Sequence, residues 1–277
     1  MKPTVSELYV YPIKSCRGNL ETQVKVQFEG IAGDRRFTLI NKQGKAVTGR
    51  THPKLTKLVV SVVDVGIEVT APDGKSLTLA YEDFSDSYLT TKVWNSVSNG
   101  QHCGDEADKW FSDYLGYDCQ LVFWSDKTDR QIADYEQQVS FADGYPLLLI
   151  GEQSLAELNN RATNVHSMSQ FRTNIVVSGT DAFAEDNWHK IRIGEVEFLV
   201  HRPCSRCKFT QLDLATGKPH AGGEPLSVLN TFRKGQDGKA YFGQNIIPLN
   251  EGIIKTTDEV IVLETKQGEV YPDNGLM

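Results

Sequence analysis

The stretch that decides the fold is residues 58–80, LVVSVVDVGIEVTAPDGKSLTLA, in which three β-rich segments follow one another. These segments are residues 58–63, 67–71 and 76–80, and the turn residues Pro72-Asp73-Gly74 separate the last two. Runs rich in β-branched residues with turn residues between them are typical of antiparallel strands joined by short connections. We therefore predict an antiparallel β region around this stretch.

The same pattern covers most of the first hundred residues. Residues 8–11, 24–28 and 36–41 are further predicted strands. A helix is predicted over residues 105–115, because apolar side chains recur there at i, i+3 and i+4 spacing and Gly116 follows as a helix-ending residue.

The second half begins after a polar stretch, residues 125–138, with an apolar run at 145–150. A helix is predicted to start at Ser154, which forms a capping box with Glu157. Strands are predicted at residues 174–178, 190–193, 196–201, 207–212 and 260–263.

These elements predict an α+β, β-rich chain of two domains, each with barrel-like closure and few helices. We place the boundary near residue 120, which gives domains at 1–120 and 121–277, with the first, β-barrel-like domain packed on the second. A chain of 277 residues with 39% hydrophobic content suits one large domain or two closely packed ones.

Charge and apolar patterning exclude several classes of function. A net charge of −7 and a pI near 5.4 argue against a nucleic-acid-binding surface, which needs a basic face. No run approaches the roughly 20 apolar residues of a membrane helix, and the N-terminus lacks the order of a signal peptide. Five cysteines without regular spacing fit a reducing compartment. We expect a cytoplasmic protein that acts on neither nucleic acid nor membrane.

Two cysteines lie three residues apart in Cys204-Ser205-Arg206-Cys207. A thiol flanked by Arg206 and Lys208 is expected to ionise more readily than a free cysteine. The thiolate is the form that binds soft metals or attacks disulfides. Cys207 is therefore the first candidate for the reactive atom.

Three other interpretations of the cysteine pair stay open. In the first interpretation, both thiols fill the core, as unpaired cysteines commonly do. In the second, they belong to a structural zinc site, although such a site usually needs a second pair, and Cys16, Cys103 and Cys119 are scattered singly. In the third, they form a thiol–disulfide pair, although that motif is expected to open a helix, and residues 207–212 favour a strand and turn.

Several basic residues are candidates for binding an anion. Lys14 and Ser15 follow the first predicted strand, where a lysine, a hydroxyl and exposed N–H groups can hold a phosphate; a solvated loop lysine is the default interpretation. In Asp34-Arg35-Arg36, two arginines on one strand point to opposite faces, so one faces inward. That arginine pairs with a nearby aspartate or with a ligand phosphate.

Polar residues at other strand ends are weaker candidates. Arg172 and Asn174 share a face at the start of an apolar strand, and together they suit a polar ring system. Asp143 lies in a turn-rich segment, where it accepts from a ligand N–H or caps the turn. Glu185 and Asp186 stand beside a tryptophan, and we assign them no catalytic role.

Taken in order, six motifs resemble the MOSC-domain family. They are YPIKSCRG at 11–18, GDRRF at 33–37, FADGYP at 141–146, FRTNIVVSG at 171–179, CSRC at 204–207 and FGQN at 242–245. The branch that the chain resembles contains the mitochondrial amidoxime-reducing component and bacterial N-hydroxylated-base reductases. The resemblance covers essentially the whole chain and implies an N-terminal MOSC β-barrel domain followed by a MOSC domain.

The resemblance implies a molybdenum cofactor (molybdopterin) bound between the two domains. It implies that Cys207 ligates the metal, with Cys204 less certain. The cofactor contacts that it implies are Lys14, Ser15, Arg35, Asp143, Arg172, Asn174 and Ser205. A soft thiolate for the metal and cations for the cofactor's phosphate agree with this assignment on chemical grounds.

The function that the resemblance implies is reduction of N-hydroxylated compounds, N–OH to N–H. No cysteine follows Cys207, so we expect no iron–sulfur centre in this chain and electrons from a separate iron–sulfur or flavin protein. An alternative is a molybdenum-cofactor carrier or sulfur-transfer module without turnover of its own. A third hypothesis is a structural or redox protein in which Cys204 and Cys207 form a disulfide.

Overall fold

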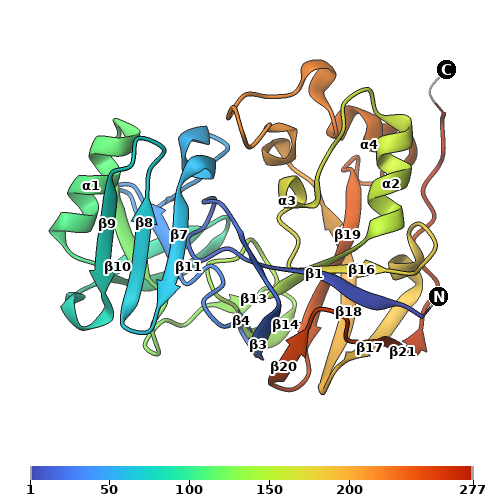
Figure 1. Cartoon of the computed structure of the whole chain (residues 1–277), viewed down its shortest axis with the longest axis horizontal. Coiled ribbons are helices and arrows are strands. Elements are labelled where there is room, and N and C mark those ends of the chain that lie inside the picture. The colour runs from blue at the N-terminus through green and yellow to red at the C-terminus, as the bar shows by residue number, and fades with distance from the viewer. Residues whose placement is uncertain (1, 276–277) are drawn as a thin grey trace. The chain divides into compact units, whose positions relative to one another are not determined.

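The computed structural model describes residues 2–275 (Figure 1). Contacts within the chain divide it into two compact units. We call residues 10–19 and 33–144 the internal unit, and residues 2–9, 20–32 and 145–275 the terminal unit. Strands make up 41% of the residues and helices 19%, which confirms the predicted β-rich α+β class. None of the helices in residues 2–275 has the length and apolar character that crossing a membrane requires.

The internal unit is built from small antiparallel sheets. Its helices are α1 (Asp105–Leu115) and the 3₁₀ helices η1 (Pro53–Lys57) and η2 (Tyr81–Asp83). Its strands are β5 (Phe37–Ile40), β6 (Ala46–Val47), β7 (Val59–Val63), β8 (Gly66–Thr70), β9 (Ser76–Ala80), β10 (Tyr88–Val93), β11 (Ser96–His102), β12 (Gln120–Phe123), β13 (Gln131–Ile132) and β14 (Tyr135–Gln138). One sheet has the order β10-β11-β12-β5-β6, and β7, β8 and β9 form a separate three-stranded sheet.

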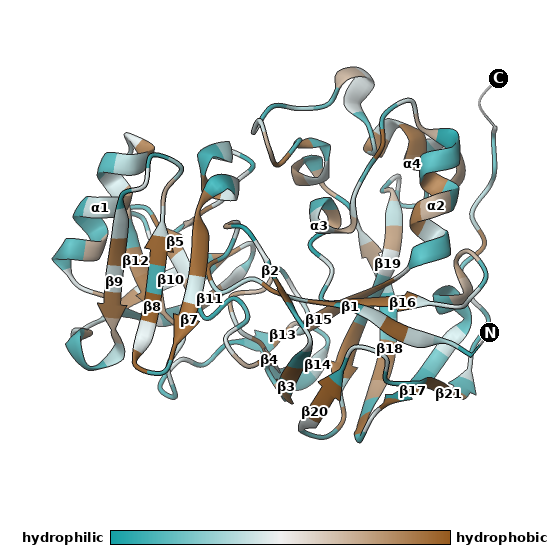
Figure 2. Ribbon diagram, in the orientation of Figure 1, coloured by the Kyte–Doolittle hydropathy of each residue, from teal (hydrophilic) through white to brown (hydrophobic). Residues whose placement is uncertain are grey.

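The stretch at 58–80 folds as predicted, because its alternating residues can bury one face of the β7-β8-β9 sheet. Val60, Ile67 and Leu79 are buried there and belong to one core with Phe111 of α1. Figure 2 shows the strands β7 and β8 largely brown, whereas much of α1 is teal. The predicted bounds of α1 are confirmed, and Gly116 ends it in the left-handed conformation at φ 67°.

The terminal unit contains an eight-stranded sheet of order β2-β1-β16-β15-β19-β18-β17-β21 and a three-stranded sheet of order β20-β3-β4. The strands are β1 (Thr4–Val10), β2 (Asn19–Glu21), β3 (Gln23–Gln27), β4 (Gly30–Ile31), β15 (Leu147–Gly151), β16 (Ile175–Ser178), β17 (Trp188–Ile193), β18 (Val196–Ser205), β19 (Tyr241–Pro248), β20 (Gly252–Lys255) and β21 (Val260–Thr265). The helices are α2 (Glu152–Arg161), α3 (Met168–Phe171), α4 (Leu226–Phe232), η3 (Ala184–Asn187), η4 (Lys208–Gln211) and η5 (Ala221–Gly223).

Strands β15 and β16 run parallel, with α2 and α3 in the connection between them. Their neighbours β19 and β1 are antiparallel to them. Ile150, Phe171 and Phe242 pack in the core of this unit together with α2 and α4. The sheet therefore places the end of β18 and the end of α3 on one framework, and both carry candidate site residues.

Two predictions in this unit are wrong. The predicted strand at residues 207–212 is wrong, because β18 already ends at Ser205 and residues 208–211 form the 3₁₀ helix η4. Helix α2 begins at Glu152, two residues before the predicted start, and Ser154 makes no capping box. Its hydroxyl donates to the buried Glu185 at 2.8 Å and accepts from the Phe183 N–H at 2.8 Å, so a tertiary contact replaces the local one.

Candidate functional site

The segment Cys204–Cys207 lies at the end of strand β18 and directly before helix η4. Cys207 precedes η4 as its N-cap residue, and its carbonyl accepts from the Thr210 N–H at 3.0 Å and from the Thr210 hydroxyl at 2.9 Å. The residue is half-buried and its thiol is not in a disulfide. Because Cys207 is only half-buried, core filling does not describe it.

Arg206 contacts the other cysteine. Its Nη1 donates to Cys204 Sγ at 2.9 Å and its Nη2 donates to the Phe171 carbonyl at 2.6 Å. Cys204 is half-buried and packs against the core of the terminal unit. The cation that the sequence placed beside Cys207 therefore lies against Cys204 in the structure. Ser205, which lies between Cys204 and Arg206 in the sequence, is exposed at the end of β18, opposite Tyr241 of β19.

The FRTN motif reaches the same segment through Arg172. Arg172 follows α3 in the left-handed conformation at φ 56°, and its guanidinium carbon lies 5.3 Å from the centre of the Phe209 ring in η4. Because Phe209 is two residues from Cys207, the structure brings the FRTN and CSRC motifs together in one unit. A guanidinium over an aromatic face is held by cation–π attraction.

Asn174, which the sequence paired with Arg172, is buried in the sheet. Its Nδ2 donates to the Tyr9 carbonyl at 3.1 Å and its Oδ1 accepts from the Leu148 N–H at 3.2 Å. The amide thus joins β1 and β15 to β16. Its contacts in this structure are with the fold itself.

The internal unit holds a buried lysine at the predicted anion site. Lys14 is 6% exposed, so the default interpretation of a solvated loop lysine is wrong. Its Nζ donates to Asp143 Oδ1 at 2.5 Å and to the Phe141 carbonyl at 2.9 Å. Asp143 also accepts from Trp94 Nε1 at 3.1 Å. The YPIKSC and FADGYP motifs therefore meet in one ion pair.

Burial and neighbouring cations act on this lysine. Burial lowers the pKa of Lys14 to about 8, against the attraction of Asp143, and the charges of Arg130 and Arg35 lower it further. Burial raises the pKa of Asp143, but the Lys14 charge and the hydrogen bonds from Lys14 and Trp94 outweigh it and hold that pKa well below the usual range. An anion placed here would favour the charged lysine.

Arg130 is a site residue that the sequence did not reveal. It is buried, its Nη1 donates to the Ser140 carbonyl and its Nη2 to the Asp143 carbonyl at 3.1 Å. Its Nε is buried and has no hydrogen-bond partner among residues 2–275. It lies in the polar stretch 125–138, whose composition gives no sign of burial.

Arg35 forms the structural ion pair that was one of its two predicted roles. Its Nη1 lies 2.5 Å from Asp34 Oδ2, and its guanidinium carbon lies 4.3 Å from the centre of the Tyr11 ring. The prediction that Arg35 alternates with Arg36 along a strand is wrong, because β5 begins at Phe37 and Arg35 has φ 47°. Ser15 is also buried, with φ 71°.

The cationic cluster of the internal unit, defined as Lys14, Arg35 and Arg130, faces two carboxylates, Asp34 and Asp143. A buried group of three cations suits an anionic ligand.

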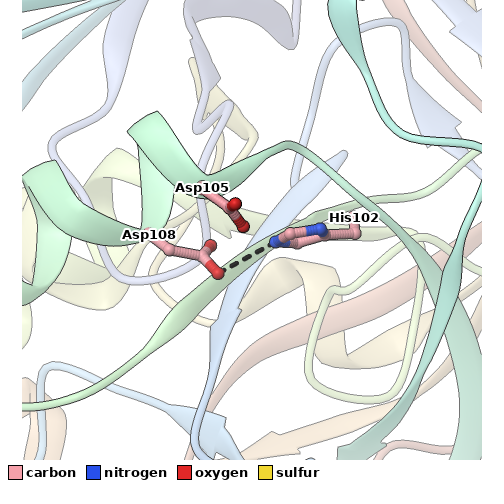
Figure 3. Close-up of side chains that lie close together, drawn as sticks. All are labelled: His102, Asp105 and Asp108. Carbon is pink, nitrogen blue, oxygen red and sulfur yellow. Dashed lines mark hydrogen bonds and ion pairs between the residues drawn. The ribbon is translucent and has the colours of Figure 1, made fainter.

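A second polar cluster in this unit is structural. His102, Asp105 and Asp108 place ligand atoms within 4.8 Å of one another, and His102 Nε2 lies 2.9 Å from Asp108 Oδ2 (Figure 3). Asp108 also accepts from the Leu121 N–H at 2.9 Å and from Gln120 Nε2 at 3.1 Å. These bonds fasten α1 to β12, and they account for the position of Asp108 without a metal.

Comparison with known proteins matches both parts of the chain. Residues 2–118 match the family described as "MOSC N-terminal beta barrel domain" and residues 136–261 match the "MOSC domain". The chain is 31% identical to "Mitochondrial amidoxime-reducing component 1" of Mus musculus, across 94% of this chain and 82% of that protein.

Two further relatives match at similar identity. "Mitochondrial amidoxime reducing component 2" of Bos taurus is 34% identical, across 83% of this chain and 72% of that protein. "Molybdenum cofactor sulfurase" of Oryza sativa subsp. japonica is 30% identical across 97% of this chain, which spans only 35% of the sulfurase.

Proposed function

We propose, because this chain belongs to the MOSC-domain family with amidoxime-reducing components among its relatives, that it is a molybdenum-cofactor-dependent reductase of N-hydroxylated compounds. In this reaction the N–O bond breaks, two electrons and two protons are taken up, and the amine and water leave. The observation that carries the proposal is Cys207, a half-buried residue whose thiol is not in a disulfide and whose backbone carbonyl accepts a hydrogen bond from Thr210.

Each unit holds residues whose chemistry suits one part of a molybdenum cofactor. A thiolate is the soft ligand that a sulfur-rich metal centre prefers. The cationic cluster of the internal unit offers three cations, and the buried Arg130 Nε has an unused N–H among residues 2–275, which suits the acidic end of such a cofactor. When bound, the cofactor supplies the two-electron chemistry, and the protein supplies binding and orientation.

We assign Cys207 as the metal ligand and as the catalytic residue. Lys14, Ser15, Arg35, Asp143, Arg172, Asn174 and Ser205 are the proposed cofactor contacts, and Arg130 joins them on the grounds of its burial. Of these, Asn174 hydrogen-bonds backbone groups of two strands through its side-chain amide, so its contribution is to hold the backbone that precedes β16.

The wider setting of the reaction is part of the proposal. Electrons come from a separate iron–sulfur or flavin protein, and the substrate is a small N-hydroxylated molecule. The two-domain division near residue 120 stays a prediction. So does the cytoplasmic location, since the amidoxime-reducing relatives carry the word mitochondrial in their names.

A second candidate is a cofactor carrier or sulfur-transfer module. The match to a molybdenum cofactor sulfurase over 97% of this chain favours it. In that function Cys207 would hold the cofactor or a persulfide and pass it to another enzyme. The two candidates share the thiol and differ in turnover.

Protein produced in a host that makes the molybdenum cofactor, and in a strain that lacks the pathway, separates these functions. We expect about one molybdenum per chain from the first host and reduction of benzamidoxime with a strong artificial reductant. Cys207→Ser should lose both metal and activity, whereas the matched variant Cys204→Ser should keep the metal. Metal-loaded protein without turnover would favour the carrier, and activity in metal-free protein would refute both.

A further inference from the structure

Gln170 links the two motifs of the terminal unit. It is the third residue of α3, its side chain is buried, and its Nε2 donates to the Thr210 carbonyl in η4 at 3.0 Å. Thr210 in turn donates from its N–H and its hydroxyl to the Cys207 carbonyl. The amide of Gln170 is therefore two hydrogen bonds from the backbone of the proposed metal ligand.

The orientation of this amide is fixed by partners of opposite polarity. Its Oε1 accepts from the Ser167 N–H at 3.3 Å, and Nε2 lies 3.3 Å from His166 Nδ1 in addition to its bond with Thr210. An amide nitrogen has two N–H groups, so both bonds are satisfied when His166 Nδ1 accepts. A flipped amide would set Oε1 against the Thr210 carbonyl, which is unfavourable.

The contact of His166 with Glu224 supports the same orientation of the Gln170 amide. With Nδ1 accepting, the proton of His166 is on Nε2, which lies 3.4 Å from Glu224 Oε2. Glu224 is itself held by the N–H groups of Thr163 at 3.0 Å and Asn164 at 2.9 Å. Burial, and the neighbouring His220, lower the pKa of His166, which favours its neutral, accepting form.

We propose that Gln170 is a positioning residue for Cys207: it fixes the η4 turn that carries the thiol against helix α3, and Arg172 follows that helix. The inference rests on the proposed role of Cys207 as metal ligand. Replacing the N–H donor by an acceptor would repel the Thr210 carbonyl and loosen the turn while leaving the shape of the side chain nearly unchanged.

The variants for the test are Gln170→Glu, which keeps the acceptor for Ser167, and Gln170→Leu, which removes all three bonds. Gln211 supplies the matched control, because it lies in the same helix η4 and its Nε2 donates to the Gly223 carbonyl at 2.8 Å, away from Cys207. Gln211→Glu therefore makes the same chemical change without touching the proposed link.

The first measurement needs no cofactor. In protein from the host without the pathway, the rates at which iodoacetamide alkylates Cys207 and Cys204 are read by peptide mass spectrometry. We expect Gln170→Glu to raise the Cys207 rate roughly fivefold relative to Cys204, as expected for the loss of one hydrogen bond, with Gln211→Glu unchanged. Equal rates in all variants would overturn the inference.

The second measurement uses metal-loaded protein. At equal molybdenum content, Gln170→Glu should change the electron paramagnetic resonance spectrum of the one-electron-reduced metal, because that spectrum reports how the thiolate is oriented. An unchanged spectrum together with unchanged alkylation rejects the role of Gln170 and leaves the proposed function standing. Retention of metal by Cys207→Ser rejects the proposed function instead, whatever the Gln170 variants show.

Discussion

The Lys14 ammonium lies 2.5 Å from Asp143 Oδ1, yet Lys14 is buried whereas 67% of the Asp143 side chain is exposed. Burial of Lys14 outweighs the attraction of Asp143 and lowers the pKa of Lys14 to about 8.

The first prediction concerns the stability of the protein at alkaline pH. Between pH 8 and 10.5 the unfolded chain keeps the Lys14 proton and the folded chain has lost it, so the free energy of unfolding rises with pH. Relative to Lys14→Met, the wild type should gain on the order of 3 kcal/mol over this range. Urea denaturation of both proteins at pH 7, 8, 9 and 10 measures the gain; parallel curves would contradict it.

The second prediction concerns Arg206. Its Nη1 lies 2.9 Å from Cys204 Sγ and favours the thiolate of that cysteine. Arg206→Gln should slow alkylation of Cys204 at pH 8 by roughly threefold or more, with a smaller effect on Cys207. Lys208→Gln is the control, because Lys208 is exposed beside Cys207. A larger slowing at Cys207 than at Cys204 would show that Arg206 acts on the other thiol.

The third prediction concerns the buried carboxylate of Glu185, which accepts from the Gly151 N–H at 3.1 Å and from the Ser154 hydroxyl. Burial, then the charge of Asp186, raise its pKa, so the folded chain holds a proton that the unfolded chain releases above about pH 4.5. The wild type should therefore lose stability relative to Glu185→Gln as the pH rises from 4.5.

Removing the acceptor of Glu185 altogether tests its structural role. Glu185→Ala should cost about 3 kcal/mol at pH 7, since the Gly151 and Ser154 donors at the start of α2 are left without a buried acceptor. Thermal and urea unfolding measure this loss. A variant as stable as the wild type would mean that these donors find other partners.

The fourth prediction concerns the glycine of the FGQN motif. Gly243 has φ 78°, and a Cβ there would lie 2.5 Å from Ile150 Cγ1 and 2.9 Å from the Leu149 carbonyl oxygen. Gly243→Ala should destabilise the protein by about 3 kcal/mol through strain and overpacking. Gly74→Ala, at φ 85° but with nothing within 4 Å, should cost about 1 kcal/mol. Similar losses in both would show that crowding at Gly243 is relieved.

Much of the fold was readable from local pattern. The strands at 58–80 and helix α1 follow from the alternation of apolar residues and from Gly116, because these signals act between near neighbours in the chain. Helix α3, which begins after Ser167 with a capping box to Gln170, was not predicted. Cysteine spacing and motif order pointed to Cys207 before any contact was known.

Tertiary structure decided what the local pattern left open. Residues 208–211 form η4 where a strand was predicted, and the Ser154 hydroxyl donates to Glu185, 31 residues away. The burial of Lys14, like that of Arg130, depends on segments that meet only on folding. The sequence by itself therefore determined the order of the elements and the chemistry available. Which donor meets which acceptor, and hence the electrostatics around Lys14 and Cys207, came from long-range packing that no spacing encodes.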